Sequence, residues 1–568
     1  MISGAGAFGN NEYDAIVIGS GAAGLTCATR LAQAGQRVLL AEKNEWLGGY
    51  SHGFSQDGFY WDHGGHIFLA YKLGAQARQV FQRLKLDQRL EMVPDKHDYR
   101  CIFPDESLAI PADMTEAADV FTQRFPDERE GIARVLLIME SMIDQVDAFV
   151  PSFRVADRPG ERHLFDPVME QFQRPKFGSL LSRSVRGQLM PGSNLLKYQT
   201  RTLTDLLNEY LRDPRLKGYF SMLSAGIGIG PSRLSAPIAG VFFIHALRTM
   251  WMPKGGFGQL AASLGELFEE SGGTIVTGAE VSRITTHEGR VTGVETADGR
   301  NYRANYVVSA CDARHTFLDM LDPLVVPADL RARLPKMDLS PSIFQVHLGV
   351  DMDLEPYRKD IKRLNFIYST DNIDRAMQNF PEGNVEDAAF FLYVATFHQP
   401  EMAPPGQHSL KLEAYTTLNA RGIDWERDKE QISQVFIRRA EKLIPDLGNH
   451  IVTKALRTPN DLLRDTGNSE GAFAGWAFTP ELLSRGRPQQ RTPVPGLYLA
   501  GHWTTPSAGV PWVMLSGFNT AGMVIADRQG GRKLPLPRTL LERRRAAQGK
   551  PLPPERAALI TGSPRDDD

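Results

Sequence analysis

The apolar and polar positions of the first forty residues predict a strand, a helix and a second strand. Ala15–Ile18 is a short apolar run of the length of a buried parallel strand. A stretch with helical character follows the glycines after Ile18, and Val38–Ala41 is a second apolar run. This order is that of a βαβ unit, the repeating element of a doubly wound sheet.

The same alternation of helices and strands returns further along the chain. We expect a hairpin over 54–62 around Asp57-Gly58, strands within 101–111 around an Asp-Glu turn, and a helix from 74 to about 90. Residues 114 to about 247 have a mostly helical pattern. After a helix over 259–271, the expected strands are 274–276, 280–285, 291–296, 306–309, 343–350, 390–396 and 497–500, with helices over 427–443 and 509–527.

These elements predict an α/β fold with a discontinuous Rossmann-like nucleotide-binding domain and an inserted mixed α+β substrate domain. We expect the nucleotide domain to consist of residues 12–115, 254–318 and 485–530. Residues 116–253 and 319–484 form the substrate domain, and 531–568 form a flexible tail. A chain of 568 residues is too long for a single core, which agrees with this division.

Composition narrows the class of protein. Hydrophobic residues make up 42% of the chain and the net charge is -3, which favours a soluble globular protein and excludes a nucleic-acid partner. The three cysteines lie far apart and form no C-x-x-C, which is typical of a reducing compartment. With no secretory signal and no long apolar run, we expect a cytoplasmic protein, or one attached peripherally to the inner membrane face.

The glycines after the first strand carry the strongest chemical signal. Gly19, Gly21 and Gly24 form a G-x-G-x-x-G, in which the first allows the tight turn and the second lets backbone approach a pyrophosphate. The third lets the helix pack on the strand. The N-terminus of the helix favours phosphate. Glu42 closes the second strand, where its carboxylate can accept ribose hydroxyls and repel a 2′-phosphate.

No second fingerprint of this kind stands elsewhere in the sequence. Gly226–Pro231 is glycine-rich, but no clear strand precedes it and a proline follows directly. We therefore expect no built-in NAD(P)H domain. Electrons would pass to or from a diffusing partner such as a quinone, oxygen or another reductant.

Three histidines lie close together around Asp62. His52, His63 and His66 do not have the spacing of a convergent ligand set, so we predict no metal. His66 is a candidate for a polar residue near the bound cofactor, and the others are candidates for structural hydrogen bonding. No Ser-His-Asp set or paired carboxylates stand out, which leaves His66 and Tyr60 as the candidate catalytic acid or base.

Two further features point to the substrate and its surroundings. Trp503 and Trp512 flank a glycine-rich turn and are candidates for a pocket that holds a long apolar substrate, whereas Trp46 and Trp61 favour core packing. The stretch from Gln171 to Thr204 has no acidic residue and carries six basic ones among leucines. Such a segment is typical of an anionic membrane surface or of an ordinary solvated face.

Three segments resemble the FAD-dependent oxidoreductases of the carotenoid isomerase, phytoene desaturase and retinol saturase branch. They are Gly49–Gly64, Met252–Leu260 with the helix after it, and Gly496–Pro511 with Ser516-Gly517 beyond. The match covers the whole FAD domain. It is specific for fold and cofactor, and less so for the reaction, since this branch desaturates, saturates or isomerises its substrates.

The resemblance implies a role for particular positions. Ala22 and Ala23 would help Gly19 and Gly21 cradle the pyrophosphate, and Glu42 with Lys43 would lie at the adenosine ribose. Gly48, Gly49, Tyr50 and Ser51 would follow the ribityl chain, Gly65 and His66 the flavin ring, and the Val281 backbone the adenine. Gly501, His502, Val510, Pro511 and Met514 would cover the flavin from the other side.

This sequence departs from the wider fold at one point of the flavin turn. Many relatives carry an acid after the glycine at 501, where this chain has His502, and Trp503 and Trp512 make the segment unusually aromatic. The substrate pocket would then differ from that of a standard carotenoid enzyme.

The resemblance implies a desaturase, saturase or cis–trans isomerase that acts on C–C single or double bonds of a hydrophobic polyene or isoprenoid such as a carotenoid. Two alternatives of the same fold stay open. A flavin amine oxidase would have an aromatic cage beside the flavin and would consume oxygen with amines. A non-enzymatic lipid escort would have a degraded nucleotide fingerprint.

Overall fold

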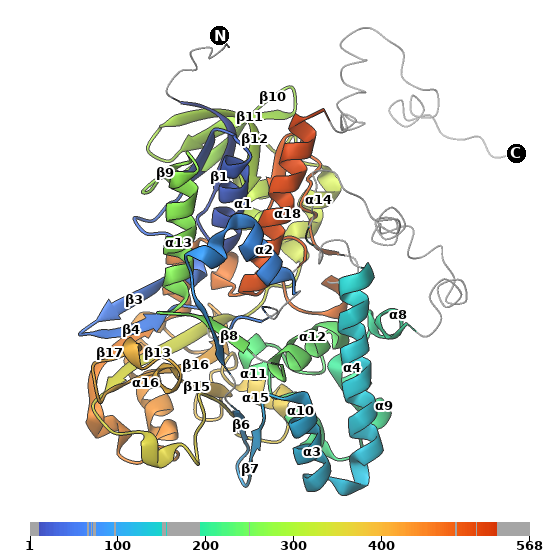
Figure 1. The fold of residues 1–568 in the computed structure, drawn as a ribbon, viewed down its shortest axis with the longest axis vertical. Coiled ribbons are helices and arrows are strands. Elements are labelled where there is room, and N and C mark those ends of the chain that lie inside the picture. The colour runs from blue at the N-terminus through green and yellow to red at the C-terminus, as the bar shows by residue number, and fades with distance from the viewer. Residues whose placement is uncertain are drawn as a thin grey trace, which may run out of the picture.

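The computed structural model describes residues 11–64, 67–69, 71, 75–95, 98–149, 155, 193–248, 250–482, 486–506 and 508–530. Two sheets organise these residues (Figure 1). In Figure 1 the first sheet lies in the upper half with helices beside it, and the second lies in the lower half.

The first sheet has seven strands and contains the βαβ unit. Its order is β10-β11-β12-β1-β2-β9, and β18 pairs with the end of β12. The pairs among β9, β2, β1, β12 and β18 are parallel, whereas β10, β11 and β12 form an antiparallel meander. The strands are β1 (Glu12–Ile18), β2 (Val38–Ala41), β9 (Thr274–Val276), β10 (Val281–His287), β11 (Arg290–Thr296), β12 (Asn301–Ser309) and β18 (Leu497–Leu499).

Helices α1 (Ala22–Gln33), α13 (Phe257–Glu270) and α18 (Val510–Arg528) pack beside this sheet, with α2 (Gln76–Leu84) against α18. Glycines allow the closest approaches. A Cβ on Gly24 would lie 1.9 Å from the carbonyl oxygen of Gly19, and one on Gly517 would lie 2.1 Å from that of Ala23. The third fingerprint glycine therefore lets α1 pack on the turn before it, and Gly517 lets α18 pack on α1.

The second sheet also has seven strands, in the order β17-β13-β16-β15-β14-β6-β7. It is antiparallel except for the parallel pair β14–β6. The strands are β6 (Tyr99–Ile102), β7 (Ser107–Ile110), β13 (Ser342–Val350), β14 (Leu364–Ile367), β15 (Phe390–Val394), β16 (His408–Thr416) and β17 (Ile451–Arg457). Smaller pairs are β3 (Gly53–Gln56) with β4 (Phe59–Asp62), and β5 (Met92–Asp95) with β8 (Met250–Pro253).

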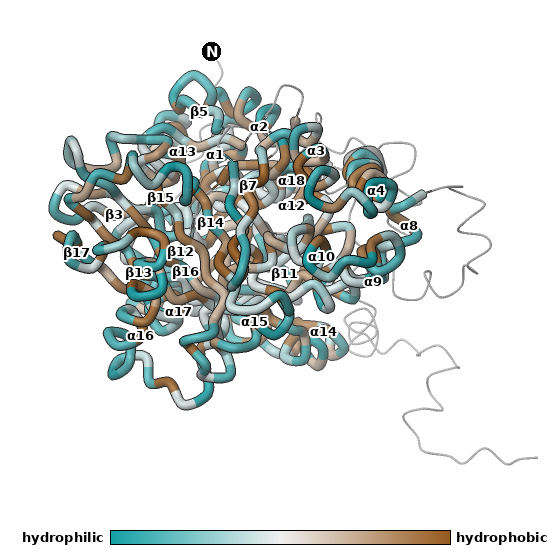
Figure 2. The backbone as a smooth tube through the Cα atoms, turned by 90° about the horizontal axis from the view of Figure 1, so that it is seen from below, coloured by the Kyte–Doolittle hydropathy of each residue, from teal (hydrophilic) through white to brown (hydrophobic). Residues whose placement is uncertain are grey.

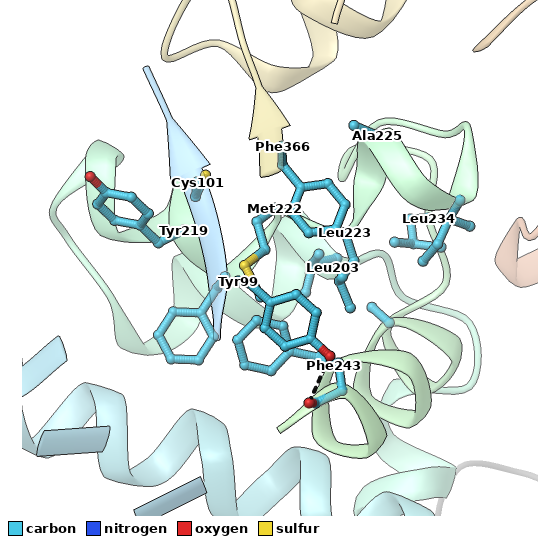
Figure 3. Packing of buried hydrophobic residues seen from close by; sticks show 14 of the residues in the cluster. Tyr99, Cys101, Leu203, Tyr219, Met222, Leu223, Ala225, Leu234, Phe243 and Phe366 are labelled. Carbon is cyan, nitrogen blue, oxygen red and sulfur yellow. Dashed lines mark hydrogen bonds between the residues drawn. The ribbon is translucent and has the colours of Figure 1, made fainter. Parts of the chain in front are cut away.

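Both faces of the second sheet are buried. On one face, Phe344 of β13 stacks on Trp425 of α16 (Trp425–Ala440). On the other, a layer of helices packs against residues such as Tyr99 and Phe366 (Figure 3). These helices are α3 (Met114–Arg124), α4 (Arg129–Phe149), α8 (Asn194–Tyr198), α9 (Leu203–Tyr210), α10 (Pro214–Phe220), α11 (Ser224–Ile227) and α12 (Ala236–Ala246). The remaining helices are α14 (Ala328–Arg333), α15 (Ile373–Asn379) and α17 (Pro459–Thr466).

The hydrophobic positions of the chain gather towards the middle of the molecule, and its outer loops are mostly hydrophilic (Figure 2). The hairpin around Asp57-Gly58 and the helices near 259–271, 427–443 and 509–527 are confirmed within a few residues. The predicted α/β fold is confirmed. No helix among the described residues is both long enough and apolar enough to cross a membrane.

The sheets show where our domain boundaries need adjustment. Strands β6 and β7 lie within segment 12–115, which we assigned to the nucleotide domain, yet they pair with β14 of the second sheet. We therefore propose that the division falls before residue 98, with the rest of the expected domains unchanged. This pairing was not predictable from the sequence, because the partner of β6, strand β14, lies more than 250 residues later in the chain. The tail 531–568 lies outside the described residues.

Candidate functional site

A cavity of about 630 Å³ runs from the glycine turn of the first sheet to the aromatic residues of the second. Its two ends differ in chemistry. The nucleotide end is lined by Ile18–Ala23, Ala41–Asn44, Gly48–Ser51, Ala279–Ser282, Ala310, Cys311, His315, Asp319, Met320, Leu463 and Asp465–Asn468. The other end, which we name the chamber, is lined by Ile67, Leu69, Leu223, Ile227, Phe242, Leu364, Phe366, Phe391, Tyr415, Phe473, Phe478 and Trp512.

The glycine turn leaves open space where a phosphate group needs it. Gly19 has a φ of +93°, and its N–H donates to the carbonyl of Ala41 at 2.8 Å, which fixes the turn at the end of β1. A Cβ placed on Gly21 would meet no atom within 4 Å, although this glycine lines the cavity. Backbone at Gly21 can thus be approached closely, and α1 begins directly after it.

Glu42 is buried and held in place by four hydrogen bonds. Its Oε2 accepts from the backbone N–H of Ser20 at 2.8 Å and from the Ser20 hydroxyl at 2.6 Å. Its Oε1 accepts from the backbone N–H of Asn44 at 2.9 Å and from Asn44 Nδ2 at 3.0 Å. The carboxylate is therefore oriented at the cavity wall before any ligand is considered.

The turn after Glu42 continues the wall. Gly48 has a φ of +114°, and a Cβ there would lie 2.8 Å from the Cβ of Ala261, so only glycine fits. A single 3₁₀ turn, η1 (Gly49–Ser51), follows. The Tyr50 hydroxyl donates to the carbonyl of Ala472 at 3.2 Å, and its ring lies 5.0 Å from that of Phe473. Tyr50 thus stands where the nucleotide end meets the chamber.

His502 lies in the middle of the cavity wall, directly after β18. The Gly501 N–H donates to the Ser516 hydroxyl at 3.1 Å, which joins this turn to α18. His502 has a buried Nε2 with no hydrogen-bond partner among the described residues, and its ring lies 6.4 Å from that of Tyr50. Burial, with a smaller effect of Arg487, lowers the pKa of His502 to about 4. The imidazole is therefore neutral near pH 7.

The N-terminus of α18 borders the same part of the cavity. Val510, Pro511, Trp512 and Val513 line it, and Gly509 with a φ of +103° forms the turn into the helix. The positive end of the helix dipole favours negative charge at this place. Trp512 lies 5.4 Å from Phe242 by ring centroids and forms part of the chamber. A role of Trp512 in holding the substrate stays a prediction.

Four predicted site residues do not line the cavity, and one of them, Gly24, supports the glycine turn from behind. Trp503 is 1% exposed, donates from Nε1 to Oδ1 of Asn468 at 2.8 Å, and packs edge-on against Trp476 in the core of the first sheet. The Tyr60 hydroxyl donates to Asp62 at 2.9 Å and accepts from the N–H of Gly258 at 3.0 Å. Met514 is fully buried between α18 and its neighbours. The predictions of a pocket role for Trp503 and a catalytic role for Tyr60 are therefore corrected to structural roles.

Of the three histidines near Asp62, the structure describes His52 and His63, which make aromatic contacts. His66 and Gly65 lie outside the described residues. His52 stacks on Trp46 at 4.2 Å, and His63 lies 5.1 Å from His52 in an edge-on contact. Burial lowers the pKa of His63 well below its usual range. Over the described chain, no three His, Cys, Asp or Glu side chains are placed to share a metal ion.

Several lining residues escaped sequence reasoning. The chamber aromatics other than Trp512 come from α12, β14, β15, β16 and the loop on either side of Trp476, and no local motif marks them. The loop Asp465–Asn468 at the end of α17 also lines the nucleotide end. Thr458 and Asp461 form a capping box that could have indicated this helix from the sequence, but not its place at the cavity.

Among the described residues, one dinucleotide cradle opens into an apolar chamber, an arrangement that fits a flavin-dependent oxidoreductase. The family model described as flavin containing amine oxidoreductase matches residues 22–525, and the chain belongs to this family. Its cofactor is FAD. The open space at Gly21, the oriented Glu42 and the unpartnered Nε2 of His502 are features that fit such a cofactor.

The resemblance to the carotenoid isomerase and desaturase branch is confirmed by curated relatives. The chain is 27% identical to prolycopene isomerase of Arabidopsis thaliana over 91% of this chain and 84% of that protein. It is 27% identical to the lycopene-forming phytoene desaturase of Pantoea ananas, over 90% and 99% respectively. The 4,4'-diaponeurosporene oxygenase of Staphylococcus haemolyticus is 27% identical over 90% and 97%.

Solved structures share the fold at lower identity. Putrescine oxidase in its wild-type form bound to putrescine has a TM-score of 0.61 at 14% identity, covering 91% of this chain and 99% of that one. Cyclohexylamine oxidase from Brevibacterium oxydans has a TM-score of 0.59 at 15% identity over 91% and 99%. At these identities the likeness establishes the architecture alone.

Proposed function

We propose that this protein is a FAD-dependent desaturase, saturase or cis–trans isomerase acting on C–C single or double bonds of a hydrophobic polyene or isoprenoid such as a carotenoid. The observation that carries the proposal is the chamber. Its described wall holds seven aromatic side chains, namely five Phe residues, Tyr415 and Trp512, together with aliphatic residues and no Asp, Glu, Lys or Arg. A long hydrocarbon gains free energy by leaving water for such a wall.

The charged lining residues all lie at the nucleotide end, which we propose as the site of the FAD nucleotide. There, Gly19, Gly21, Ala22 and Ala23 would hold the pyrophosphate and Glu42 the ribose, with Lys43 beside it. Gly24 supports the turn from behind, because its Cβ position is filled by the Gly19 carbonyl. Val281 would meet the adenine. FAD, when bound, supplies the two-electron chemistry that no side chain can supply.

The residues between the two ends would position the flavin and the substrate against each other. We propose that Gly48–Ser51 follow the ribityl chain and that Gly501, His502, Val510 and Pro511 border the flavin ring. The neutral imidazole of His502 can donate or accept one hydrogen bond without placing a charge in the chamber. The N-terminus of α18 would stabilise negative charge on the reduced cofactor. The aromatic wall excludes water from the reacting carbons.

The chamber also separates this proposal from an amine oxidase. An alkylammonium substrate brings a positive charge, whose burial without a partner is costly. The described wall of the chamber offers it no carboxylate. The intact glycine turn, in turn, is unlike the degraded fingerprint that a lipid escort would have.

We further propose that electrons pass to or from a diffusing partner, such as a quinone, oxygen or a separate reductant. One dinucleotide cradle is present in the described chain, with no second fingerprint in the sequence. A polyene substrate resides in lipid, so peripheral attachment to an anionic inner membrane face belongs to the same proposal. The basic segment expected to make that contact, Gln171–Thr204, lies mostly outside the described residues.

The proposal is tested by anaerobic incubation of the FAD-loaded protein with carotenoids, retinoids and fatty polyenes. Flavin bleaching and product geometry are followed together. Bleaching with a more unsaturated product identifies a desaturase. Isomerised product that forms only with pre-reduced flavin identifies an isomerase, and a more saturated product with re-oxidised flavin identifies a saturase. Bleaching by amines with no response to any polyene would contradict the proposal.

A further inference from the structure

Helix α17 (Pro459–Thr466) belongs by sequence to the second sheet but ends at the nucleotide end of the cavity. It follows β17 directly, and Arg457 at the end of that strand pairs with Asp465 at 2.6 Å. Beyond Asp465, residues Thr466–Asn468 line the cavity. The segment that follows β17 of the second sheet therefore forms one wall of the nucleotide end, whose glycine motif lies in the first sheet.

The end of this helix is capped by the turn that follows Glu42. The last carbonyls of a helix lack partners within the helix. In α17, the Leu463 carbonyl accepts from the N–H of Gly467 at 2.8 Å. The next two carbonyls accept from outside: that of Arg464 from Lys43 Nζ, and that of Asp465 from Asn44 Nδ2 at 2.8 Å. An ammonium group at a helix C-terminus is also favoured by the helix dipole.

Asn44 joins this cap to the predicted ribose ligand. Its backbone N–H and Nδ2 both donate to Oε1 of Glu42, at 2.9 and 3.0 Å. The same Nδ2 donates to the carbonyl of Asp465. Glu42, Asn44 and the end of α17 thus form one continuous hydrogen-bonded network beside the cavity.

We propose that the end of α17 (Leu463–Asn468), fastened by Lys43 and Asn44, is a clasp that retains the nucleotide of FAD. Release of the nucleotide then requires the two side-chain bonds to open, so the clasp sets the rate of cofactor loss. The proposal rests on the nucleotide lying along Gly19–Glu42, as proposed above, and does not depend on the substrate.

The first test measures release of FAD from the loaded full-length protein, followed as the rise in flavin fluorescence after dilution. The variants are Lys43→Ala, Asn44→Ala and the double variant. Lys43→Ala removes one hydrogen bond to the helix end, and Asn44→Ala removes one to Asp465 and one to Glu42. Since each lost bond corresponds to roughly a tenfold change at ~1.4 kcal/mol, we expect release about tenfold faster for Lys43→Ala, at least tenfold faster for Asn44→Ala and faster still for the double variant. Release within twofold of the parent in all three would overturn the proposal.

A matched control separates the clasp from general damage to β17. Lys454→Ala removes the surface ion pair with Glu430 three residues before the end of that strand and leaves both caps in place. We expect its release rate to equal that of the parent. An increase as large as that of Asn44→Ala would show that any loosening of β17 suffices, which contradicts a role for the caps.

The second test uses the unaltered protein, so it stands even where a variant does not fold. Hydrogen exchange of peptides covering 459–468 is compared in the FAD-loaded and FAD-free protein. We expect slower exchange at the end of α17 when FAD is bound. Equal exchange, with FAD shown to be bound, overturns the clasp, whereas protein that binds no FAD at all contradicts the proposed function instead.

Discussion

The two ends of the cavity differ in what forms their walls. At the nucleotide end the wall includes backbone turns at Gly19 and Gly48 and the carboxylate of Glu42, which is held by four hydrogen bonds. In the chamber the wall is made of side chains such as Phe366, Phe391 and Trp512. A backbone wall accepts few substitutions and serves one ligand, whereas a wall of side chains can be reshaped. We therefore infer that the backbone fold determines which cofactor binds, and that a few aromatic side chains determine which substrate binds.

The largest expected effect comes from adding one side chain to the glycine turn at the nucleotide end. Gly21→Val places its side chain in the open space of the cavity and meets no protein atom within 4 Å of its Cβ. We expect FAD binding to fall by more than 100-fold, because the space for the pyrophosphate is lost, with roughly ±0.5 kcal/mol change in the stability of the FAD-free protein. Fluorescence titration and a urea melt measure the two. Unchanged FAD affinity would show that the nucleotide does not pass Gly21.

The next largest effect on FAD affinity should come from Glu42, the buried carboxylate of the same wall. Glu42→Ala removes a carboxylate and leaves four donors, two from Ser20 and two from Asn44, without their acceptor. We expect FAD affinity to fall about 30- to 100-fold, since an unmade hydrogen bond to a charged group costs ~1.5–3 kcal/mol. Isothermal titration of the FAD-free protein measures this. A loss of less than threefold would contradict its proposed role at the ribose.

A substitution in the chamber should change the affinity for the substrate and leave the affinity for FAD unchanged. Trp512→Ala enlarges the chamber, so we expect about tenfold weaker apparent affinity for a polyene, equal to ~1.4 kcal/mol of lost burial, at unchanged FAD affinity. Trp503→Ala is the matched control. It empties a core site and should destabilise the protein by ~3–5 kcal/mol, as measured by urea unfolding. Trp512 is itself only 4% exposed, so its loss also lowers stability, and the deciding result is the polyene affinity: an affinity equal to that of the parent in Trp512→Ala would contradict its role in the chamber.

The smallest expected effect is on the pH dependence of stability, and it comes from His502, where the two ends of the cavity meet. The pKa of His502 is about 4 in the folded protein, against an ordinary 6.5. The unfolded chain therefore binds more protons between these values, and His502 makes stability fall as the pH drops from about 6.5 to about 4. We expect the melting temperature of His502→Gln to decline less than that of the parent across this window. Parallel declines would argue against a buried, neutral imidazole.

The contrast also explains how much the sequence alone could predict. The βαβ unit, its glycines and Glu42 lie within thirty residues, and their spacing is set by local geometry, so the nucleotide end was predictable. Phe242, Phe366 and Phe478 reach the chamber from distant elements, and nothing near them in sequence distinguishes a chamber residue from a core residue. Trp503 and Trp512 illustrate the limit. They flank one turn, yet the first faces the core of the first sheet and the second the chamber.

The clasp at α17 was beyond prediction for the same reason. The sequence around Lys43 and Asn44 predicts a turn, with Lys43 at the ribose, but no contact with a distant helix, because their acceptors are carbonyls 421 residues further along the chain. Only the packing of the two sheets brings the helix end to the turn. The strands β6 and β7 are a parallel case, since their place in the second sheet depends on β14.

The most direct test of the central claim is whether the chamber takes an uncharged polyene. We would titrate the FAD-loaded protein anaerobically with a carotenoid in detergent micelles and follow the shift of the polyene's visible absorption, in the parent and in Phe366→Glu. The account predicts a saturable shift in the parent that Phe366→Glu abolishes while retaining FAD, and no competition by alkylamines. A shift that persists in Phe366→Glu, or that an alkylamine displaces, would contradict it.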